Sequence, residues 1–410
     1  MNSSEYIALE EKYGAHNYHP LPVVLTKGSG AEVWDVEHKK YFDFLSAYSA
    51  VNQGHCHPRI IAALNEQAGR LTLTSRAFYN DQLGLFEQKL HQLFGYDMAL
   101  PMNTGAEAVE TAIKICRKWA YEKKGIRPNQ AKIVFFDSNF HGRTLSAISA
   151  STEQSSTGGF GPYVPGLIIL PYGDLELARE YLITDPNIAG VIIEPIQGEA
   201  GVIIPPPGFL TELFNICKQT NVLFIADEIQ TGLGRTGSWL CCDQHAIRPD
   251  MVLLGKAISG GVIPVSAVLA DHHIMEVLKP GQHGSTYGGN PLAARVSLVA
   301  LQVLEDEHLI DKAATLGLKL EKSLIDLKTD CNWITDTRGK GLLHAIEIDD
   351  EPTGDTAWNI CLDLAKQGLL AKPTRGNIIR LAPPLVITES QLDECIDILR
   401  QVFMLREAYA

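Results

Sequence analysis

Short, continuously apolar runs alternate with segments of helical periodicity through the middle of the chain, and this pattern constrains the fold more than any other feature. Parallel strands that are buried on both faces read as unbroken apolar runs, and the connections between them are usually helices. We therefore predict an α/β fold with a mostly parallel central sheet. The expected strands are 133–136, 167–170, 191–194, 222–226, 251–254 and 264–269.

The pattern changes near residue 293, where a helical stretch that reaches about residue 328 precedes two strands, near 342–348 and 377–381, and a last helix that begins at Thr388. A chain of 410 residues also exceeds the size at which one hydrophobic core usually stops growing. We therefore expect a large and a small domain. The predicted division is an N-terminal segment that packs with the small domain (1–40), a large domain (41–290) and a small α+β domain (291–410).

The net charge is −13 at pH 7, so the field around the protein repels phosphate backbones and anionic membrane surfaces. The first 14 residues carry three glutamates and lack an apolar core, and the longest apolar runs are too short to span a bilayer. The eight cysteines form no C-x-x-C motif, which suits reduced thiols. We therefore expect a soluble, cytoplasmic protein with no nucleic-acid or membrane partner.

Polar side chains follow four of the predicted strands at the point where each strand ends. In an open α/β sheet, ligands bind beyond the carboxyl ends of the strands. An acid, a lysine, an aromatic ring and an arginine should therefore meet at one edge of the sheet. These polar groups comprise Asp137, Phe140, His141 and Arg143 after the first strand, Glu194, Gln197 and Glu199 after the third, Asp227, Glu228 and Gln230 after the fourth, and Lys256 after the fifth.

Lys256 and Asp227 are the strongest candidates for chemistry. Desolvation at the end of an apolar strand lowers the pKa of a lysine, as a Schiff-base lysine requires, but such a lysine can also be an ion-pair partner. An acid at the end of a buried strand needs a cation, and the protonated ring nitrogen of an electron-sink cofactor would be one. A structural carboxylate that caps the next turn is the alternative for Asp227 or Glu228.

Two loops of small residues could bind an anion. Asn103–Ala106 opens a helix, whose free N–H groups and dipole attract negative charge, and Ser285–Asn290 offers further hydroxyl and N–H groups. By contrast, Gly54–His57 has two histidines without a third ligand nearby in sequence. We interpret these histidines as turn and packing residues and predict no metal site.

Taken together, six motifs resemble those of the class III aminotransferases. The resemblance runs in order from about residue 16 to the C-terminus. It implies the fold type I of pyridoxal-phosphate-dependent transferases, with a large cofactor-binding domain and a small α+β domain, and pyridoxal 5'-phosphate as the cofactor. The motifs are Asn103–Ala108, Phe140–Arg143, Glu194–Glu199, Asp227–Gly232, Lys256 and His283–Asn290.

The resemblance also implies a role for each residue of the cofactor site. Lys256 would carry the cofactor as a Schiff base and shuttle the proton, while Asp227 would pair with the pyridine nitrogen. Gln230 would contact the phenolic oxygen, and Phe140 would stack on the ring. The remaining members of the expected cofactor site are Gly105 and Ala106 at the phosphate, His141, Glu194, and the partner subunit's Thr286, which makes the expected assembly a homodimer with shared active sites.

Within this class, three segments are similar to the members that act on the δ-amino group of L-ornithine: Tyr13–Tyr18, Ser46–Gly54 and Ile378–Pro384. That similarity implies that Arg143 and Tyr18 bind the α-carboxylate of ornithine. Tyr48 would shape the pocket so that the δ-amine, and not the α-amine, reaches the cofactor.

The second substrate implied by the resemblance is 2-oxoglutarate, whose α-carboxylate would bind Arg380. Glu199 would neutralise this arginine during the first half-reaction and swing away when the dicarboxylate arrives, because an unpaired buried guanidinium is costly. A static ion pair is the alternative. The expected products are L-glutamate and glutamate 5-semialdehyde, which cyclises to pyrroline-5-carboxylate.

Three other functions compete with this prediction. The nearest is another ω-aminotransferase, acting on acetylornithine or 4-aminobutyrate, which would share the cofactor motifs. An aminomutase of the same fold would use the same lysine without a second substrate. A catalytically inactive binding protein is the third, although every position that maps to a catalytic role is occupied as expected.

Overall fold

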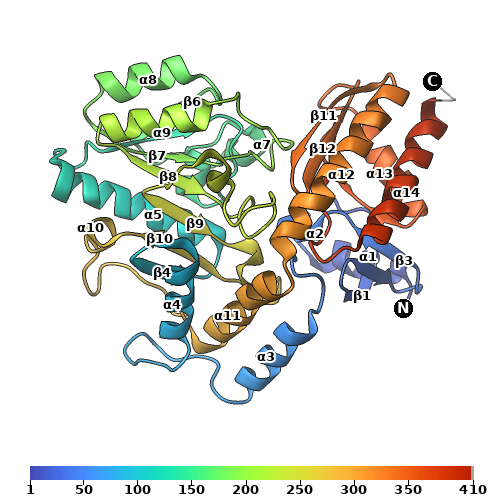
Figure 1. The fold of residues 1–410 in the computed structure, drawn as a ribbon, viewed down its shortest axis with the longest axis horizontal. Helices are drawn as coiled ribbons and strands as arrows, with labels where there is room; N and C mark the ends of the chain where they lie inside the picture. The colour runs from blue at the N-terminus through green and yellow to red at the C-terminus, as the bar shows by residue number, and fades with distance from the viewer. Residues whose placement is uncertain (408–410) are drawn as a thin grey trace.

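A seven-stranded sheet forms the centre of the larger body of the protein, a computed structural model that describes residues 1–407 (Figure 1). Its strand order is β4-β10-β9-β8-β7-β5-β6. Only β10 runs antiparallel to its neighbours, so the predicted mostly parallel sheet is confirmed. The strands are β4 (Met98–Met102), β5 (Lys132–Phe136), β6 (Leu167–Leu170), β7 (Ile188–Ile193), β8 (Leu223–Asp227), β9 (Met251–Leu254) and β10 (Ser266–Ala270).

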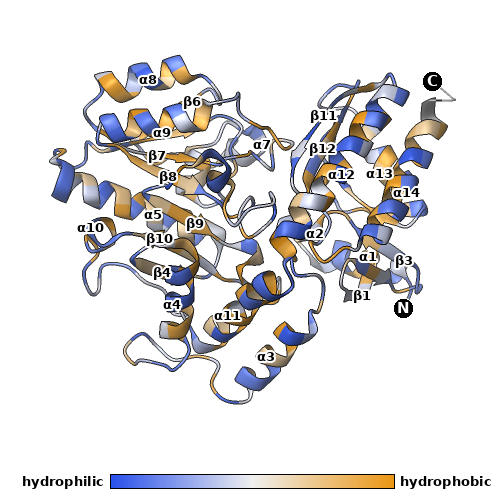
Figure 2. Cartoon of the chain, viewed as in Figure 1, coloured by the Kyte–Doolittle hydropathy of each residue, from blue (hydrophilic) through white to orange (hydrophobic). Residues whose placement is uncertain are grey.

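Helices cover both faces of this sheet because its central strands are buried throughout. Every residue of β7, β8 and β9 is buried, which explains their unbroken apolar runs. One face packs against α5 (Gly105–Trp119) and α10 (His272–Met275), and the other packs against α8 (Leu175–Thr184) and α9 (Phe209–Gln219). Figure 2 shows that α8 and α9 carry both apolar and polar residues, as expected for helices with one buried face.

Within the seven-stranded sheet, β4 is the strand that the sequence pattern did not predict. Its sequence, MALPM, contains Pro101, which cannot donate a backbone hydrogen bond. Proline is tolerated in a sheet at an edge, and β4 lies at the edge of the sheet beside β10.

The smaller body contains a four-stranded antiparallel sheet in the order β11-β12-β15-β14. The helical stretch predicted over 293–328 is two helices, α11 (Pro291–Asp306) and α12 (Leu309–Asp330), which are interrupted at His308, where φ is 51°. A capping box at Thr388 starts the predicted last helix: the backbone N–H of Gln391 donates to Thr388 Oγ1 at 3.2 Å, and Thr388 N–H donates to Gln391 Oε1 at 2.9 Å. The other elements here are β11 (Ile334–Lys340), β12 (Leu343–Ile348), α13 (Thr356–Lys366), β14 (Lys372–Arg375), β15 (Ile378–Leu381) and α14 (Glu389–Glu407).

The N-terminal segment contributes a third sheet with the order β1-β2-β3-β13. β2 (Glu32–Asp35) and β3 (Lys40–Asp43) form a hairpin, which follows α1 (Ser3–Tyr13) and β1 (Leu25–Ser29). β3 pairs in parallel with β13 (Leu369–Leu370), so the segment is joined to the C-terminal part of the chain. The division of the chain at residues 40 and 290 stays a prediction.

The remaining helices connect these sheets, and none in the described residues is long and apolar enough to cross a membrane. They are α2 (Ser46–Ser49), α3 (Pro58–Ala68), α4 (Leu83–Phe94), α6 (Leu145–Ser149) and α7 (Gln154–Thr157), with short 3-10 or π turns at Ala120–Lys124, Cys241–His245 and Lys256–Ser259.

Candidate active site

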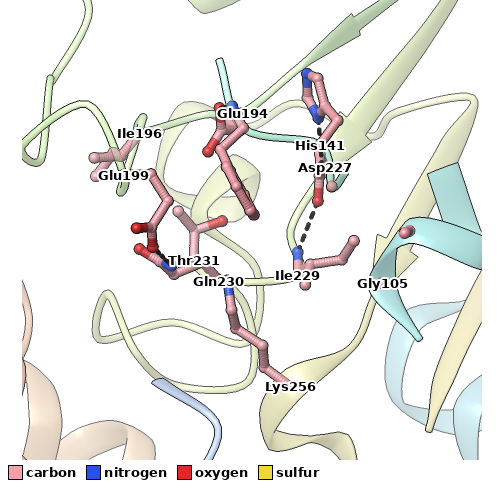
Figure 3. Close-up of a pocket in the computed structure, with 13 residues that line it drawn as sticks. Gly105, His141, Glu194, Ile196, Glu199, Asp227, Ile229, Gln230, Thr231 and Lys256 are labelled. Atoms are coloured by element: carbon pink, nitrogen blue, oxygen red, sulfur yellow. Dashed lines mark hydrogen bonds and ion pairs between the residues drawn. The ribbon is translucent and has the colours of Figure 1, made fainter. Parts of the chain in front are cut away.

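A cavity of about 180 Å³ lies at the carboxyl ends of the parallel strands. The segments that follow β5, β7, β8 and β9, the strands after which reactive polar residues were predicted, each contribute to the lining of this cavity. This arrangement follows from the parallel sheet, because strands that run in the same direction end at the same edge. The cavity is lined by Gly105, Ala106, Phe140, His141, Gly142, Glu194, Ile196, Glu199, Asp227, Ile229, Gln230, Thr231 and Lys256 (Figure 3).

Asp227 is the last residue of β8 and is 4% exposed. Its Oδ2 accepts a hydrogen bond of 2.6 Å from His141 Nδ1, and its Oδ1 accepts one of 3.1 Å from the backbone N–H of Ile229 (Figure 3). Burial would lower the pKa of His141, but the hydrogen bond and charge of Asp227 outweigh burial and raise it. The result is a fixed, buried carboxylate at one end of the cavity, oriented by a histidine behind it.

Lys256 begins the turn that follows β9, and its side chain points into the cavity (Figure 3). Burial lowers the pKa of its amine, although the nearby charges of Glu199 and Asp227 oppose the shift. A lowered pKa leaves more of the amine unprotonated and able to act as a nucleophile. Its φ of 43° lies in the left-handed region, a strained conformation of the kind that gathers at functional sites.

Glu194 holds the segment that carries the aromatic ring of the site. Its Oε2 accepts a hydrogen bond of 2.9 Å from the backbone N–H of Phe140. Burial raises the pKa of Glu194 to about 7. Arg143, three residues after Phe140, lies with its guanidinium carbon 5.7 Å from the centre of the Phe140 ring and donates to Ser156 Oγ at 3.0 Å.

Gly105 and Ala106 form the first turn of α5, at the opposite end of the cavity from the Glu199 carboxylate. The predicted helix start has a capping box, because Thr104 and Glu107 exchange hydrogen bonds there. A Cβ on Gly105 would lie 3.1 Å from Ile229 Cδ1, so a larger residue would crowd the side chain of Ile229 at this end of the cavity. This helix start suits an anion.

Arg380, on β15, approaches the cavity from the smaller body. Its Nη1 donates to Glu199 Oε1 at 2.7 Å and to the carbonyl of Gly198 at 3.1 Å, and its guanidinium carbon lies 5.0 Å from the centre of the Tyr48 ring. Burial would raise the pKa of Glu199, but Arg380 and Lys256 outweigh burial and lower it. Within residues 1–407, the buried Nε of Arg380 has no hydrogen-bond partner.

Five predicted site residues do not line this cavity: Tyr18, Tyr48, Arg143, Thr286 and Arg380. Tyr18 is 73% exposed and lines a separate hollow between the N-terminal segment and α13. Thr286 is exposed on the loop between α10 and α11, where its neighbour Ser285 accepts a hydrogen bond of 3.1 Å from Asn103. In the single chain, therefore, Thr286 lies on a loop that contacts Asn103, just before α5, but Thr286 itself does not line the cavity.

The sequence interpretation missed several lining residues. Gly142 has φ of 120°, and a Cβ there would lie 2.8 Å from the Cβ of Ala106, so the site depends on glycine at this position. Ile229 packs between Gly105 and Gly255. Gly142 and Ile229 lie within motifs that we recognised by their polar residues. Their position next to those polar residues is the sequence signal that could have identified them as lining residues.

The residues present fit pyridoxal 5'-phosphate. A buried amine with a lowered pKa suits its aldehyde, the helix start at Gly105 suits its phosphate, and the buried carboxylate of Asp227 suits a protonated ring nitrogen. The aromatic ring of Phe140 provides a flat apolar surface between these ends.

The family described as Aminotransferase class-III matches residues 13–403. The chain therefore belongs to the class III aminotransferases and is a pyridoxal-phosphate-dependent transaminase of fold type I, as its motifs predicted. Its relatives include the mitochondrial ornithine aminotransferase of Rattus norvegicus, which is 58% identical over 403 residues that cover 98% of this chain and 91% of the rat protein.

Solved structures agree with this assignment. The crystal structure of the ornithine aminotransferase from Toxoplasma gondii ME49 matches with a TM-score of 0.97 at 46% identity and covers 100% of this chain and 97% of that chain. The crystal structure of the acetylornithine aminotransferase from Elizabethkingia anophelis matches with a TM-score of 0.91 at 55% identity and covers 99% of this chain and 100% of that chain.

Proposed function

We propose that this transaminase transfers the δ-amino group of L-ornithine to 2-oxoglutarate, giving L-glutamate and glutamate 5-semialdehyde, which cyclises to pyrroline-5-carboxylate. The observation that carries the proposal is the buried Arg380, which is paired with Glu199 and covered by Tyr48 beside the lysine. An enzyme that alternates between a diamino acid and a dicarboxylate needs a cation that can be neutralised for one substrate and opened for the other. The relatives named ornithine aminotransferase support the same activity.

Several residues of the cavity would act on the cofactor. When bound, pyridoxal 5'-phosphate supplies an aldehyde that takes up amino groups and a ring that withdraws electrons from the adjacent carbon. Lys256 would hold the aldehyde and would move a proton at the reacting carbon of the substrate. Asp227, held by His141, would keep the ring nitrogen protonated, and Phe140 would stack on the ring. Gln230 would contact the phenolic oxygen, and Gly105 and Ala106 would bind the phosphate through backbone N–H groups.

Arg143 and Tyr18 bind the α-carboxylate of ornithine, so that the δ-amine points to Lys256. Arg143 already lies beside Phe140, which lines the cavity. Tyr18 belongs to the exposed N-terminal segment, which must bring the hydroxyl to the substrate for this role. Substitution of Tyr18 by phenylalanine should therefore raise the KM for ornithine and leave the KM for 2-oxoglutarate unchanged.

Arg380 binds the α-carboxylate of 2-oxoglutarate, as the unpartnered Nε within residues 1–407 suggests. A carboxylate accepts two parallel hydrogen bonds from a guanidinium, and an Nε without a partner supplies one of them. Glu199 leaves Arg380 for this step, and its 25% exposed side chain has access to solvent.

The assembly is a homodimer in which the partner subunit's Thr286 completes the phosphate site. Large apolar side chains stand exposed on the single chain, among them Phe78 at 72%, Tyr79 at 104% and Tyr287, the residue after Thr286, at 58%. Exposed aromatic groups of this size mark surfaces that another molecule covers. Light scattering should give twice the mass of the chain, and a monomeric, fully active enzyme would refute the shared site.

Acetylornithine is the second candidate substrate, because the solved structure of an acetylornithine aminotransferase is 55% identical to this chain. The values of kcat/KM for ornithine, acetylornithine and 4-aminobutyrate, each with 2-oxoglutarate, separate these activities. A cytoplasmic location is also part of the proposal, whereas the rat and Drosophila relatives are named mitochondrial. Fractionation of the source cells decides that point.

A spectrum of the purified protein tests the central chemistry. The wild-type protein with pyridoxal 5'-phosphate should show a visible absorption band that bleaches when ornithine is added in the absence of 2-oxoglutarate. Lys256→Ala, prepared without external amine, should lack the band. A colourless wild-type protein after incubation with the cofactor would refute the role of Lys256, and a band that only acetylornithine bleaches would favour the second candidate.

A further inference from the structure

The segment Ser46–Ser49 forms a single turn of left-handed helix. The φ angles of its four residues are 49°, 46°, 60° and 71°, and the ψ angles of Ala47 and Tyr48 are 48° and 42°. The turn is closed by a hydrogen bond of 2.9 Å from the N–H of Tyr48 to the carbonyl of Leu45. L-residues rarely adopt this conformation in succession, because Cβ crowds the following carbonyl oxygen. Such a turn persists only where its surroundings fix it.

The start of this turn is fixed at several points. Asp43 Oδ1 accepts hydrogen bonds from the backbone N–H groups of Leu45 and Ser46, at 2.8 and 2.9 Å. The hydroxyl of Ser46, which is fully buried, donates to the carbonyl of Ala382 at 2.6 Å. The N–H of Ala382 in turn donates to the carbonyl of Phe44 at 2.7 Å. Ala382 is therefore clamped on both sides by the segment that enters the left-handed turn.

These hydrogen bonds connect the segment that carries Tyr48 to the strand that carries Arg380, and the two side chains are in contact. Ala382 follows Arg380 by two residues, and Tyr48 follows Ser46 by two residues. The guanidinium carbon of Arg380 lies 5.0 Å from the centre of the Tyr48 ring, a cation–π contact at a site where Arg380 is 2% exposed. A right-handed turn over the same residues would relieve the strain, but it would change the direction of the Cα–Cβ bond of Tyr48. The left-handed conformation is thus the one that holds the ring on the cation.

We propose that Ser46 is a positioning residue for substrate selection: through its bond to Ala382 it holds the left-handed turn in register with β15, so that Tyr48 covers Arg380 while ornithine is bound. This role rests on the proposed use of ornithine and 2-oxoglutarate by one cavity. With the turn loosened, Tyr48 no longer covers the guanidinium, and Arg380 becomes open to any amino acid that presents an α-carboxylate beside the reacting amine. Glutamate, which must present its carboxylate there, gains relative to ornithine.

The test measures the two amino donors separately with the cofactor-loaded enzyme. The rate at which ornithine and glutamate each bleach the visible band, without an oxo acid, is recorded for the wild type, Ser46→Ala and Ser46→Gly. We expect the ornithine-to-glutamate rate ratio to fall by about fivefold or more in both variants, the scale of one lost hydrogen bond and a weakened cation–π contact. Ser46→Gly is included because glycine adopts a positive φ freely, so this variant folds even where the alanine variant does not.

Ala47→Gly is the matched control. Ala47 is exposed, its φ of 46° suits glycine, and the substitution leaves the Ser46 bond in place. Its rate ratio should stay within about twofold of the wild type. The proposal is overturned if the two Ser46 variants keep the wild-type ratio, if they lose both rates in proportion, or if Ala47→Gly shifts the ratio as strongly as they do. A wild-type enzyme whose band ornithine does not bleach would instead overturn the proposed function.

Discussion

Arg380 and Glu199 form an ion pair of 2.7 Å in which the side chain of the arginine is 3% exposed and that of the acid 25% exposed. The acid also accepts a hydrogen bond of 3.0 Å from Gln230. The two partners thus differ in freedom: the cation is enclosed on a strand, and the acid stands on a loop with access to solvent. A buried cation that loses its partner costs far more than an exposed one, so Glu199 can leave only when another anion replaces it.

Glu199→Ala should invert the preference for the amino donor. Without the acid, the cation repels the positively charged end of ornithine and remains open to the α-carboxylate of glutamate. We expect the ratio of kcat/KM for glutamate to kcat/KM for ornithine to rise by about tenfold or more, since removal of one partner of a buried pair is worth several kcal/mol. Steady-state kinetics with each donor give the ratio, and an unchanged ratio would mean that the ion pair is static.

Asp227→Asn should reduce kcat for ornithine by about 100-fold, because the neutral amide no longer stabilises a protonated ring nitrogen or the paired His141. Glu228→Gln is the control at the neighbouring acid. The Glu228 carboxylate accepts from Thr231 and from the backbone N–H of Cys242, and it does not line the cavity. If the two variants lose comparable amounts of kcat for ornithine, Asp227 has only a structural role.

The fold was predictable where a single physical cause shaped the sequence. Burial on both faces produced the unbroken apolar runs of β7, β8 and β9, and Asp227 and Lys256 stood out because they end or follow such runs. Prediction failed where local and tertiary preferences differ. β4 contains Pro101 and is a strand only because the edge of the sheet accepts it. The break between α11 and α12 occurs at His308, which carries no strong helix-breaking signal.

The site could be predicted only in part, for the same reason. Motifs identify the residues that carry chemistry, but not the contacts that orient them. The pairing of His141 with Asp227 joins residues 86 positions apart in sequence. The left-handed turn at Ser46–Ser49 contains neither glycine nor asparagine, the residues that favour this conformation, so local sequence argues against it. Contacts that are distant in sequence fix it, among them the bond of Ser46 to Ala382.

His283→Ala should increase the rate of cofactor loss by about fivefold, the scale of one or two lost hydrogen bonds. The imidazole joins the loop that carries Thr286 to α5: Nε2 lies 2.8 Å from Thr111 Oγ1, and Nδ1 lies 2.8 Å from Lys114 Nζ. Because the Thr111 hydroxyl already donates to the carbonyl of Glu107, Nε2 acts as the donor and Nδ1 as the acceptor. Dilution of the loaded enzyme, followed by its visible band, measures the rate.

The same contact predicts how cofactor retention depends on pH. Burial and the nearby charge of Lys114 lower the pKa of His283, with Glu107 opposing. Protonation would place two cations together and remove the acceptor at Nδ1. Cofactor loss should therefore accelerate as the pH falls below 6.5 in the wild type, and this extra acceleration should be absent from His283→Ala. Curves that stay parallel would show that the loop is held by other contacts.

His344 should make the folded state sensitive to acid, independently of the cofactor site. It is 1% exposed on β12, and its Nε2 lies 2.8 Å from the carbonyl of Gly341. Burial lowers the pKa of His344 to about 4. Because the folded state then binds a proton less tightly than the unfolded chain, its stabilising effect is complete above pH 6.5 and is lost as the pH falls from 6.5 through 4.

The change in free energy of unfolding from this residue amounts to about 3 kcal/mol over that interval, from a shift of roughly two pKa units or slightly more. His344→Gln keeps an N–H group for Gly341 but takes up no proton, so the denaturation midpoint of this variant should fall less between pH 6.5 and 4.5 than that of the wild type. His273→Gln, at an exposed histidine, should follow the wild type throughout. If His344→Gln also follows the wild type, His344 is protonated in the folded protein, and the acid sensitivity of the chain arises from other groups.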